Sequence, residues 1–207
     1  MLLSQNNSHI FICGQTRSGK TYFTGKALSE LKRPVLFINV QEEDLPAEFM
    51  IQHANKIEGK QLTQALHDGA KIDFRMPINR RISNFITEYI LTLLIKEGFT
   101  EHNPVYIAID ECHILEDEAL EAAIQVATRG LKRGCRCVFI TQRPALASKT
   151  LYTQAAEQYI FYLAPSEKQY LMNKGLDYDS CMQHWQQMGQ YSYIYYDGFK
   201  LEGRRAV

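Results

Sequence analysis

The chain has 207 residues, of which 45% are hydrophobic and 22% are charged, values that exclude a disordered, collagen-like or fibrous protein. A chain of this length buries roughly 70% of the surface that its unfolded form exposes, so we expect one domain over residues 1–207 that needs no disulfide or metal to hold its core. The 23 basic and 23 acidic side chains give a formal charge of zero, which argues against nucleic acid as a partner, because nucleic acid usually meets a basic face.

Short apolar runs alternate with helical patterns along most of the chain. In chain order, these patterns predict a strand at 9–13, a helix at 21–31, a strand at 35–40, mostly helix over the polar residues 41–70, a strand at 71–76, a helix at 82–96, a strand at 105–109, a helix at 115–131, and strands at 135–141 and 158–163. Strands that are buried on both faces and alternate with helices indicate an α/β fold, in which helices flank a mostly parallel central sheet.

The last part of the chain has a different pattern. Two short helices are expected near 166–173 and 179–187, followed by a β-hairpin in which 191–196 and 199–201 flank Asp197-Gly198, a favoured two-residue turn. The tyrosines of this hairpin could stack on nucleic-acid bases, but alternating tyrosines are more often half-buried sheet surface, and we favour that reading. The motif-bearing core therefore spans about 9–165, and the C-terminal helices and hairpin fill 166–207.

An eight-residue motif follows the first expected strand and opens the first helix. It reads Gly14-Gln15-Thr16-Arg17-Ser18-Gly19-Lys20-Thr21 and matches G-x-x-x-x-G-K-[ST]. In such a phosphate loop, backbone N–H groups and the helix N-terminus face phosphate oxygens. We expect Lys20 at the β- and γ-phosphates and the Thr21 hydroxyl on Mg²⁺. The alternative, a glycine-rich turn without a ligand, is disfavoured by the strand and helix around the motif.

Two acids end the strand at 105–109. A parallel strand delivers the residues at its carboxyl end to the edge where ligands bind, so Asp110 is expected near the metal. Glu111 can accept a proton from, or orient, a water that attacks the γ-phosphorus, as hydrolysis requires. The alternative is a helix N-terminal cap, where acids are also favoured. His113 receives no role, since a lone histidine after a strand is more often structural.

A second polar signal follows the strand at 135–141. Gln142 comes at the carboxyl end of this strand, where an amide can hydrogen-bond the γ-phosphate or the attacking water. Taken alone, a glutamine that simply starts a loop would be an equally good interpretation.

The phosphate loop, the strand ending in Asp-Glu, and Lys-x-Gly followed by an apolar strand and Thr-Gln-Arg-Pro together resemble the HerA/FtsK superfamily of ring-forming, DNA-pumping ATPases. The chain looks most like the short genome-packaging ATPases of membrane-containing, double-jelly-roll double-stranded DNA viruses. The resemblance spans residues 9 to about 150 and implies a RecA-like (ASCE) P-loop NTPase fold. It also implies Glu111 as catalytic base, Asp110 and Thr21 at the metal, Lys20 at the phosphates and Gln142 as sensor.

The resemblance further implies an arginine finger, which neutralises transition-state charge on the neighbouring subunit's nucleotide. Members of the superfamily often have Gly-Arg-Lys or Gly-Arg-His before the strand, whereas this chain has Leu131 at the arginine position. Arg129 and Arg133 flank it, and we favour Arg129 over Arg133. Solvated basic side chains are the alternative for both.

The resemblance implies an ATP- and Mg²⁺-dependent hydrolase that assembles as a homo-oligomeric ring, expected to be a hexamer, and packages double-stranded DNA into a preformed capsid. A capsid-vertex or virion membrane protein is the expected docking partner. The alternatives are a cellular HerA-like translocase or helicase, a conjugation ATPase, a small-molecule kinase and a nucleotide-gated switch. The first two usually carry an additional amino-terminal or membrane domain, for which we expect no room before Gly14.

The five cysteines form no C-x-x-C pair, which indicates a reducing compartment. The amino terminus lacks the basic and apolar regions of a secretory signal, and no apolar run approaches the roughly 20 residues of a membrane span. We therefore expect the host-cell cytoplasm as the location, with association with the virion as the alternative.

The zero net charge hides a segregation along the chain. Residues 110–121 carry six acids and no lysine or arginine, whereas 129–149 carry six bases and no acid. The total therefore does not exclude DNA or a charged subunit interface.

Overall fold

A computed structural model describes residues 3, 8–54, 58–189, 191–198 and 201–205. Within these residues, nine strands form one sheet in the order β3-β4-β2-β5-β6-β1-β7-β8-β9. The strands are β1 (His9–Cys13), β2 (Val35–Asn39), β3 (Met50–His53), β4 (Lys71–Arg75), β5 (Val105–Ile109), β6 (Cys135–Thr141), β7 (Ala155–Phe161), β8 (Ser192–Tyr196) and β9 (Leu201–Arg205). All neighbours from β3 to β7 are parallel, and β7-β8 and β8-β9 are antiparallel. The predicted fold class, a helix-flanked, mostly parallel sheet with a C-terminal hairpin, is confirmed.

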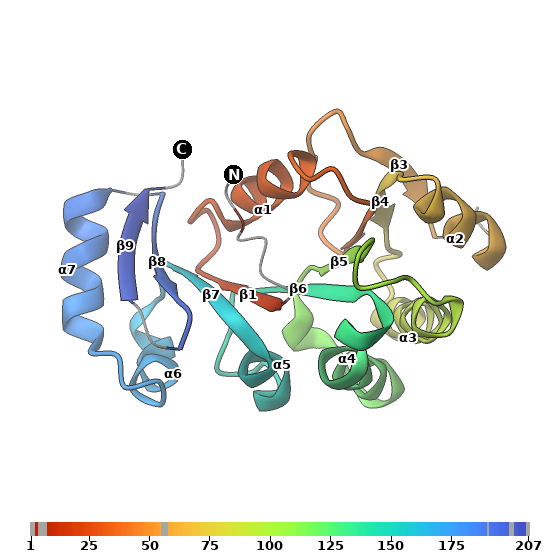
Figure 1. The fold of residues 1–207 in the computed structure, drawn as a ribbon. Helices are drawn as coiled ribbons and strands as arrows, with labels where there is room; N and C mark the ends of the chain where they lie inside the picture. The colour runs from red at the N-terminus through yellow and green to blue at the C-terminus, as the bar shows by residue number, and fades with distance from the viewer. Residues whose placement is uncertain (1–2, 4–7, 55–57, 190, 199–200, 206–207) are drawn as a thin grey trace.

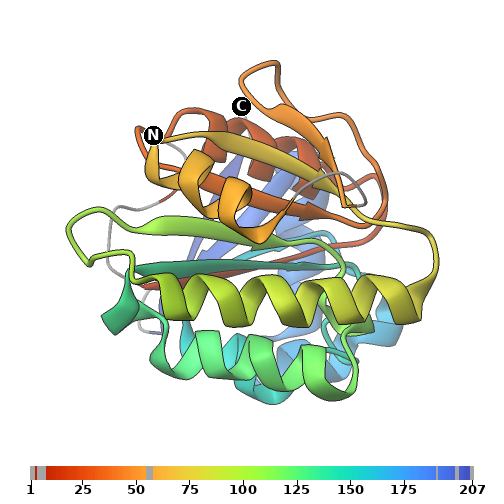
Figure 2. The ribbon, with the colours of Figure 1, turned by 90° about the vertical axis from the view of Figure 1, so that its right-hand side faces the viewer.

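Helices lie on both faces of the sheet (Figure 1). They are α1 (Lys20–Ser29), α2 (Gly59–His67), α3 (Arg80–Glu97), α4 (Asp117–Arg129), α5 (Lys149–Gln154), α6 (Lys168–Met172) and α7 (Tyr178–Met188), with 3₁₀ turns at Cys112–Ile114, Leu131–Arg133 and Pro165–Glu167. Figure 2 shows α1 above the sheet and α3 and α4 side by side below it.

The alternation of side chains along β1 explains the two layers. Ile10 and Ile12 join one buried cluster with residues of α1, whereas Phe11 and Cys13 join the other cluster, which includes residues of α3 to α7. Since successive side chains of a strand point to opposite faces, a run of five buried residues in β1 fits a strand covered on both sides.

The C-terminal hairpin is longer than predicted. β9 runs over Leu201–Arg205, and Tyr196 pairs with Leu201, not with residue 199 as a turn at Asp197-Gly198 requires. The predicted two-residue turn at Asp197-Gly198 is therefore wrong, and residues 199–200 lie outside the described part of the chain. The register fits Gly203, where an added Cβ would overlap the ring of His184 in α7, so a larger residue at this position would require the ring to move.

Tyr193 and Tyr195 are 3% and 7% exposed and pack in the cluster that contains α1. These two tyrosines are therefore buried in the core rather than half-buried as predicted, and neither is placed to stack on a base. Tyr191 precedes β8 and is 54% exposed.

Two other predictions fail for tertiary reasons. Residues 41–70, predicted to be mostly helical, contain the edge strand β3 as well as α2. β3 forms because it pairs with β4, with Met50 opposite Ile72, and local propensity does not report such a partner. The sequence patterns predict no helix between the strands at 135–141 and 158–163, where the short helix α5 lies; it leads directly into β7, which begins at Ala155 rather than at 158.

The strand order brings distant segments to one edge. β6 lies between β1 and β5, with Cys13 opposite Thr141 and Ile109 opposite Phe139. β2 lies on the other side of β5, with Ile38 opposite Ile109. The residues that follow β1, β6, β5 and β2 therefore meet at the carboxyl edge of the sheet, where ligands bind in open α/β folds.

Candidate functional site

The phosphate loop connects β1 to α1 and is held by the neighbouring strands. The Gly14 N–H donates to the Thr141 carbonyl at 3.2 Å, and the Gln15 N–H donates to the Tyr162 carbonyl at 2.7 Å. Gly19 has a φ of 92° and precedes the first residue of α1. This left-handed conformation suits glycine and turns the chain into the helix.

Several polar groups of the loop have no partner within the protein and could bind an anion. Lys20 is the first residue of α1 and is 7% exposed, and it has no ion-pair partner among the described residues. The Ser18 hydroxyl is also buried, and it has no hydrogen-bond partner among the described residues. Since buried polar groups are normally satisfied, these two side chains, together with the uncapped start of α1, fit a bound phosphate group.

Asp110 follows β5 and is 3% exposed. Burial and, to a lesser extent, the nearby Glu111 charge raise the pKa of this carboxyl to about 7, although Lys20 acts in the opposite direction. A carboxylate whose ionised form is destabilised in this way gains from a nearby divalent cation, because the cation favours the ionised form. Asp110 therefore fits the metal-ligand role predicted for it.

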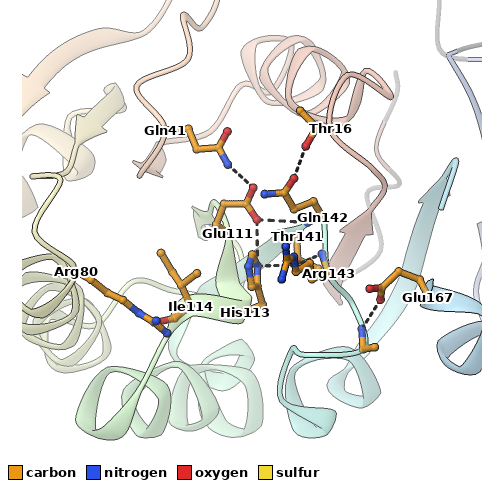
Figure 3. A network of polar contacts seen from close by, with 11 residues as sticks. Thr16, Gln41, Arg80, Glu111, His113, Ile114, Thr141, Gln142, Arg143 and Glu167 are labelled. Atoms are coloured by element: carbon orange, nitrogen blue, oxygen red, sulfur yellow. Dashed lines mark hydrogen bonds and ion pairs between the residues drawn. The ribbon is translucent and has the colours of Figure 1, made fainter. Parts of the chain in front are cut away.

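Glu111 has both carboxylate oxygens engaged (Figure 3). Its Oε1 accepts a hydrogen bond from the Gln41 amide, and its Oε2 accepts one from the Gln142 N–H at 3.3 Å. The His113 Nδ1 lies 3.1 Å from the same Oε2. The Glu111 backbone is left-handed, with φ 50° and ψ 45°, which costs a non-glycine residue about 1 to 2 kcal/mol. Strain of this kind persists where several contacts fix a side chain.

Gln142 links the phosphate loop to Glu111. Its side-chain oxygen accepts a hydrogen bond from the Thr16 hydroxyl, and its backbone N–H binds Glu111. Figure 3 shows this chain of contacts running from Thr16 through Gln142 to Glu111 and Gln41. Four segments that are at least 25 residues apart in the sequence thus share one polar network at the carboxyl edge.

Two members of this network were not predicted from the sequence. Gln41 comes two residues after β2, the strand beside β5, and the rule that parallel strands deliver polar residues to one edge could have singled it out. His113, which received no role, binds both Glu111 and the Thr141 hydroxyl, the latter at 2.9 Å. Its place in the network depends on the pairing of β5 with β6 and leaves no local signal.

The two arginine-finger candidates lie away from this network. Arg129 ends α4, and Arg133 belongs to the 3₁₀ turn before β6, so both precede the strand whose far end carries Gln142. The seven residues of β6 span about 20 Å. Both arginines are exposed. The structure does not bring them to the chain's own phosphate loop, and their role in a neighbouring subunit stays a prediction.

A pocket of about 240 Å³ adjoins the phosphate loop on the side of α7. It is lined by Gln15, Thr16, Arg17 and Ser18 of the loop and by Tyr162, Trp185, Gln186 and Gly189. The Trp185 and Tyr162 rings meet edge to face at a centroid distance of 5.6 Å. Rigid aromatic walls with a few amide groups are typical of small-molecule sites, and this pocket could hold a flat base next to phosphates in the loop.

Comparisons with known proteins agree with this arrangement. The family described as "AAA domain" matches residues 3–147, which include the phosphate loop, Asp110, Glu111 and Gln142. No curated protein sequence matches the chain.

Solved structures are similar over nearly the whole chain. One is the genome packaging NTPase B204 from Sulfolobus turreted icosahedral virus 2 in complex with AMP, with a TM-score of 0.67 at 14% sequence identity over 98% of this chain and 100% of that chain. The same protein in complex with ATP-gammaS gives a TM-score of 0.64 at 16% identity over 97% and 98%. The pCW3 conjugation coupling protein TcpA with ATPgS gives 0.56 at 12% identity over 96% and 60%. At such identities the likeness demonstrates a shared fold.

Proposed function

Since the chain belongs to the AAA domain family of P-loop ATPases, we propose that it hydrolyses ATP and uses the energy to move double-stranded DNA, packaging a viral genome into a preformed capsid. The observation that carries the hydrolytic part is the position of Glu111, a buried carboxylate next to Asp110 that is hydrogen-bonded to Gln142. A protein that only stores nucleotide needs no such base.

The residues of the chain divide the work of hydrolysis. Backbone N–H groups of the loop and the Lys20 ammonium bind and orient the phosphates. Thr21 and Asp110 would hold Mg²⁺, which neutralises charge on the phosphate oxygens when bound. Glu111 takes the proton of the attacking water, and its contacts with Gln41 and His113 fix the carboxylate for this step.

Gln142 is proposed as the sensor of the γ-phosphate. Its side chain binds Thr16 of the phosphate loop, while its backbone binds Glu111. A phosphate oxygen that accepts a hydrogen bond from the Thr16 hydroxyl, or from the side-chain NH2 of Gln142, would change the contact between these two side chains and, through the backbone of Gln142, the surroundings of Glu111. The amide thus couples occupancy of the loop to the position of Glu111 without any change of charge.

For the assembly, we propose that residues 1–207 act as one motor unit in a hexameric ring. Arg129, or Arg133 in its place, reaches the neighbouring subunit's nucleotide, in keeping with the exposure of both side chains and their distance from the chain's own site. None of the helices in the described part of the chain combines the length and apolar character that crossing a bilayer requires. We place the motor in the host-cell cytoplasm or on the virion, docked to a capsid-vertex or virion membrane protein.

We prefer packaging because the fold extends over 98 to 100% of the B204 structures, and B204 is a genome packaging NTPase. A conjugation or cellular translocase is the second candidate, favoured by the likeness to TcpA, a conjugation coupling protein. Both candidates share the ATPase site and DNA as the moving partner. Packaging of DNA into purified empty capsids distinguishes them, because only the first candidate is expected to support it.

Measurement of phosphate release with and without double-stranded DNA tests the proposal. We expect stimulation by DNA that fades with salt, because counterions compete with backbone contacts. Glu111→Gln should lower the turnover by at least a hundredfold while nucleotide binding persists, and Glu118→Gln, which changes an exposed acid of α4, should leave it unchanged. Equal rates for Glu111→Gln and the wild type would refute the assigned chemistry.

A further inference from the structure

The stretch of residues 122–176 has an unusual distribution of charge. It contains eight lysines and arginines but only two acids, Glu157 and Glu167. Both acids are buried, with 1% and 8% of their surface exposed. Glu157 accepts a hydrogen bond from the Ser8 hydroxyl at 2.7 Å, and Glu167 accepts one from the Ala145 N–H at 2.9 Å. The two carboxylates are therefore used inside the protein, and the surface formed by this stretch carries cations alone.

Seven of the eight basic side chains reach the surface, and Arg136 is buried. They are Arg129, Lys132, Arg133, Arg143, Lys149, Lys168 and, half-buried, Lys174. Within the described residues, none of them forms an ion pair with a carboxylate. Most belong to or adjoin α4, α5 and α6, which follow one another on one face of the sheet (Figure 1). Arg129 and Arg133 are set aside, because they are proposed for the neighbouring subunit's nucleotide, and we call the other five, Lys132, Arg143, Lys149, Lys168 and Lys174, the basic face.

A groove of about 690 Å³ opens on the basic face between α5, the start of β7 and the end of β8. Lys149 and Lys174 line it, together with polar side chains that include Thr153 and Asn173. One acid, Asp197, also lies at its rim. The groove thus offers two ammonium groups and several neutral hydrogen-bond donors. None of these groups belongs to the ATPase site described above.

The Lys174 ammonium is held in place by aromatic rings. It lies 4.6 Å from the centroid of Tyr152 and 5.1 Å from that of Tyr170, and these two rings meet edge to face. Cation–π contacts of this kind orient a lysine without neutralising it. Burial lowers the pKa of Lys174 to about 8, so an anion that approaches the groove also relieves the cost of keeping this ammonium charged.

We propose that the basic face binds the phosphodiester backbone of double-stranded DNA, with Lys149 and Lys174 contacting phosphates at the α5 groove. The inference rests on the proposed function and names the surface that contacts the DNA. Lysine, threonine and asparagine are side chains that proteins use for phosphate contacts, and such contacts carry no sequence information. A motor that moves any sequence needs contacts of this class.

The test measures binding of a fluorescent 30-base-pair duplex to the full chain by anisotropy between 50 and 300 mM salt. Each phosphate contact contributes about −0.9 to the slope of log K against log salt. We therefore expect the double variant Lys149→Gln/Lys174→Gln to make the slope shallower by about 2. Its rate of ATP hydrolysis in the absence of DNA should be unchanged. Lys32→Gln/Lys60→Gln removes two exposed lysines of other segments and should leave the slope as it is.

Two further variants guard against misfolding, because Lys174 packs on two rings. Lys174→Arg keeps the charge and should bind DNA as the wild type does. Lys149→Gln/Lys168→Gln changes two exposed side chains and should also make the slope shallower.

The outcomes separate the two levels of the argument. If the wild type binds DNA and the variants of the basic face keep its salt slope, the inference is overturned while the proposed function stands. If the wild type hydrolyses ATP but neither binds DNA nor responds to it, the proposed function itself fails, and the inference fails with it. Binding of polyglutamate but not of DNA to this face would identify an acidic protein partner and overturn the inference.

Discussion

Replacement of Asp110 by asparagine should stabilise the free protein while it removes Mg²⁺-dependent turnover. Burial raises the pKa of Asp110 from 3.8 to about 7, a shift of about 3 units. Each unit corresponds to 1.36 kcal/mol, so the ionised carboxylate costs the folded state up to about 4 kcal/mol. Asparagine has nearly the same shape and carries no charge, so the variant avoids this cost.

The sign of the pH dependence follows from proton linkage. The folded state binds the Asp110 proton more tightly than the unfolded state between pH 4 and 7, so the wild type loses stability as the pH rises through this interval. We expect the free energy of unfolding of Asp110→Asn to exceed that of the wild type by about 1 to 2 kcal/mol at pH 5 and by up to about 4 kcal/mol at pH 8. Urea denaturation at both pH values, without nucleotide or metal, measures the difference.

Asp73 provides a matched control. It is as buried as Asp110, at 1% exposure, but it accepts hydrogen bonds from Arg75 at 3.0 Å and from Asn39 at 2.8 Å. Asp73→Asn should therefore destabilise the protein, by about 2 kcal/mol. Mg²⁺ with nucleotide should raise the melting temperature of the wild type more than that of Asp110→Asn. A difference between Asp110→Asn and the wild type that does not grow with pH would contradict the reasoning.

Three other predictions concern separate parts of the molecule. His113→Ala should lower the turnover number about tenfold with little change in nucleotide affinity, because it loosens Glu111 without touching the phosphate loop; equal loss of affinity in a nucleotide-binding titration would count against this. Gly203→Ala should lower the melting temperature by several degrees, since its Cβ would lie 1.9 Å from the His184 ring, and an unchanged thermal transition would contradict the register of β9. Arg129→Ala chains are expected to be inactive alone and to regain turnover when mixed with Glu111→Gln chains, because each variant supplies the residue that the other lacks at a shared interface. If a mixing assay shows no recovery for Arg129→Ala but recovery for Arg133→Ala, the arginine finger is Arg133.

The elements that could be predicted are those whose signal is local and redundant. The strands around Ile10, Ile107 and Val138 are apolar runs bounded by turn residues, and their bounds in the structure agree with the prediction within a residue. The position of the site could be predicted for the same reason, because the residues that follow parallel strands meet at one edge of the sheet. Asp110 and Gln142 could be placed near the phosphate loop on that ground alone.

The parts that could not be predicted depend on partners far along the chain. β3 exists because β4 lies beside it, and its exposed Met50 and Ile51 give no buried-strand pattern. His113 gains its contacts from the pairing of β5 with β6. The register of the hairpin places Gly203 against His184 of α7, a contact far from the turn residues. Each of these features depends on a tertiary contact between residues far apart in the sequence, so no short stretch of sequence contains both partners.

The zero net charge illustrates the same limit for function. A sum over the chain counts Glu157 and Glu167 as equal to exposed acids, although both are buried and hydrogen-bonded. Exposed charges separated by more than about 8 to 10 Å are largely screened at physiological salt, so a polyanion responds to the local surface and not to the total. The acids at 110–121 lie at the start of α4 and before it, whereas the first cation of the basic face is Lys132, after the end of α4. A protein with zero net charge can therefore present a mostly cationic surface to DNA, and composition alone cannot exclude that partner.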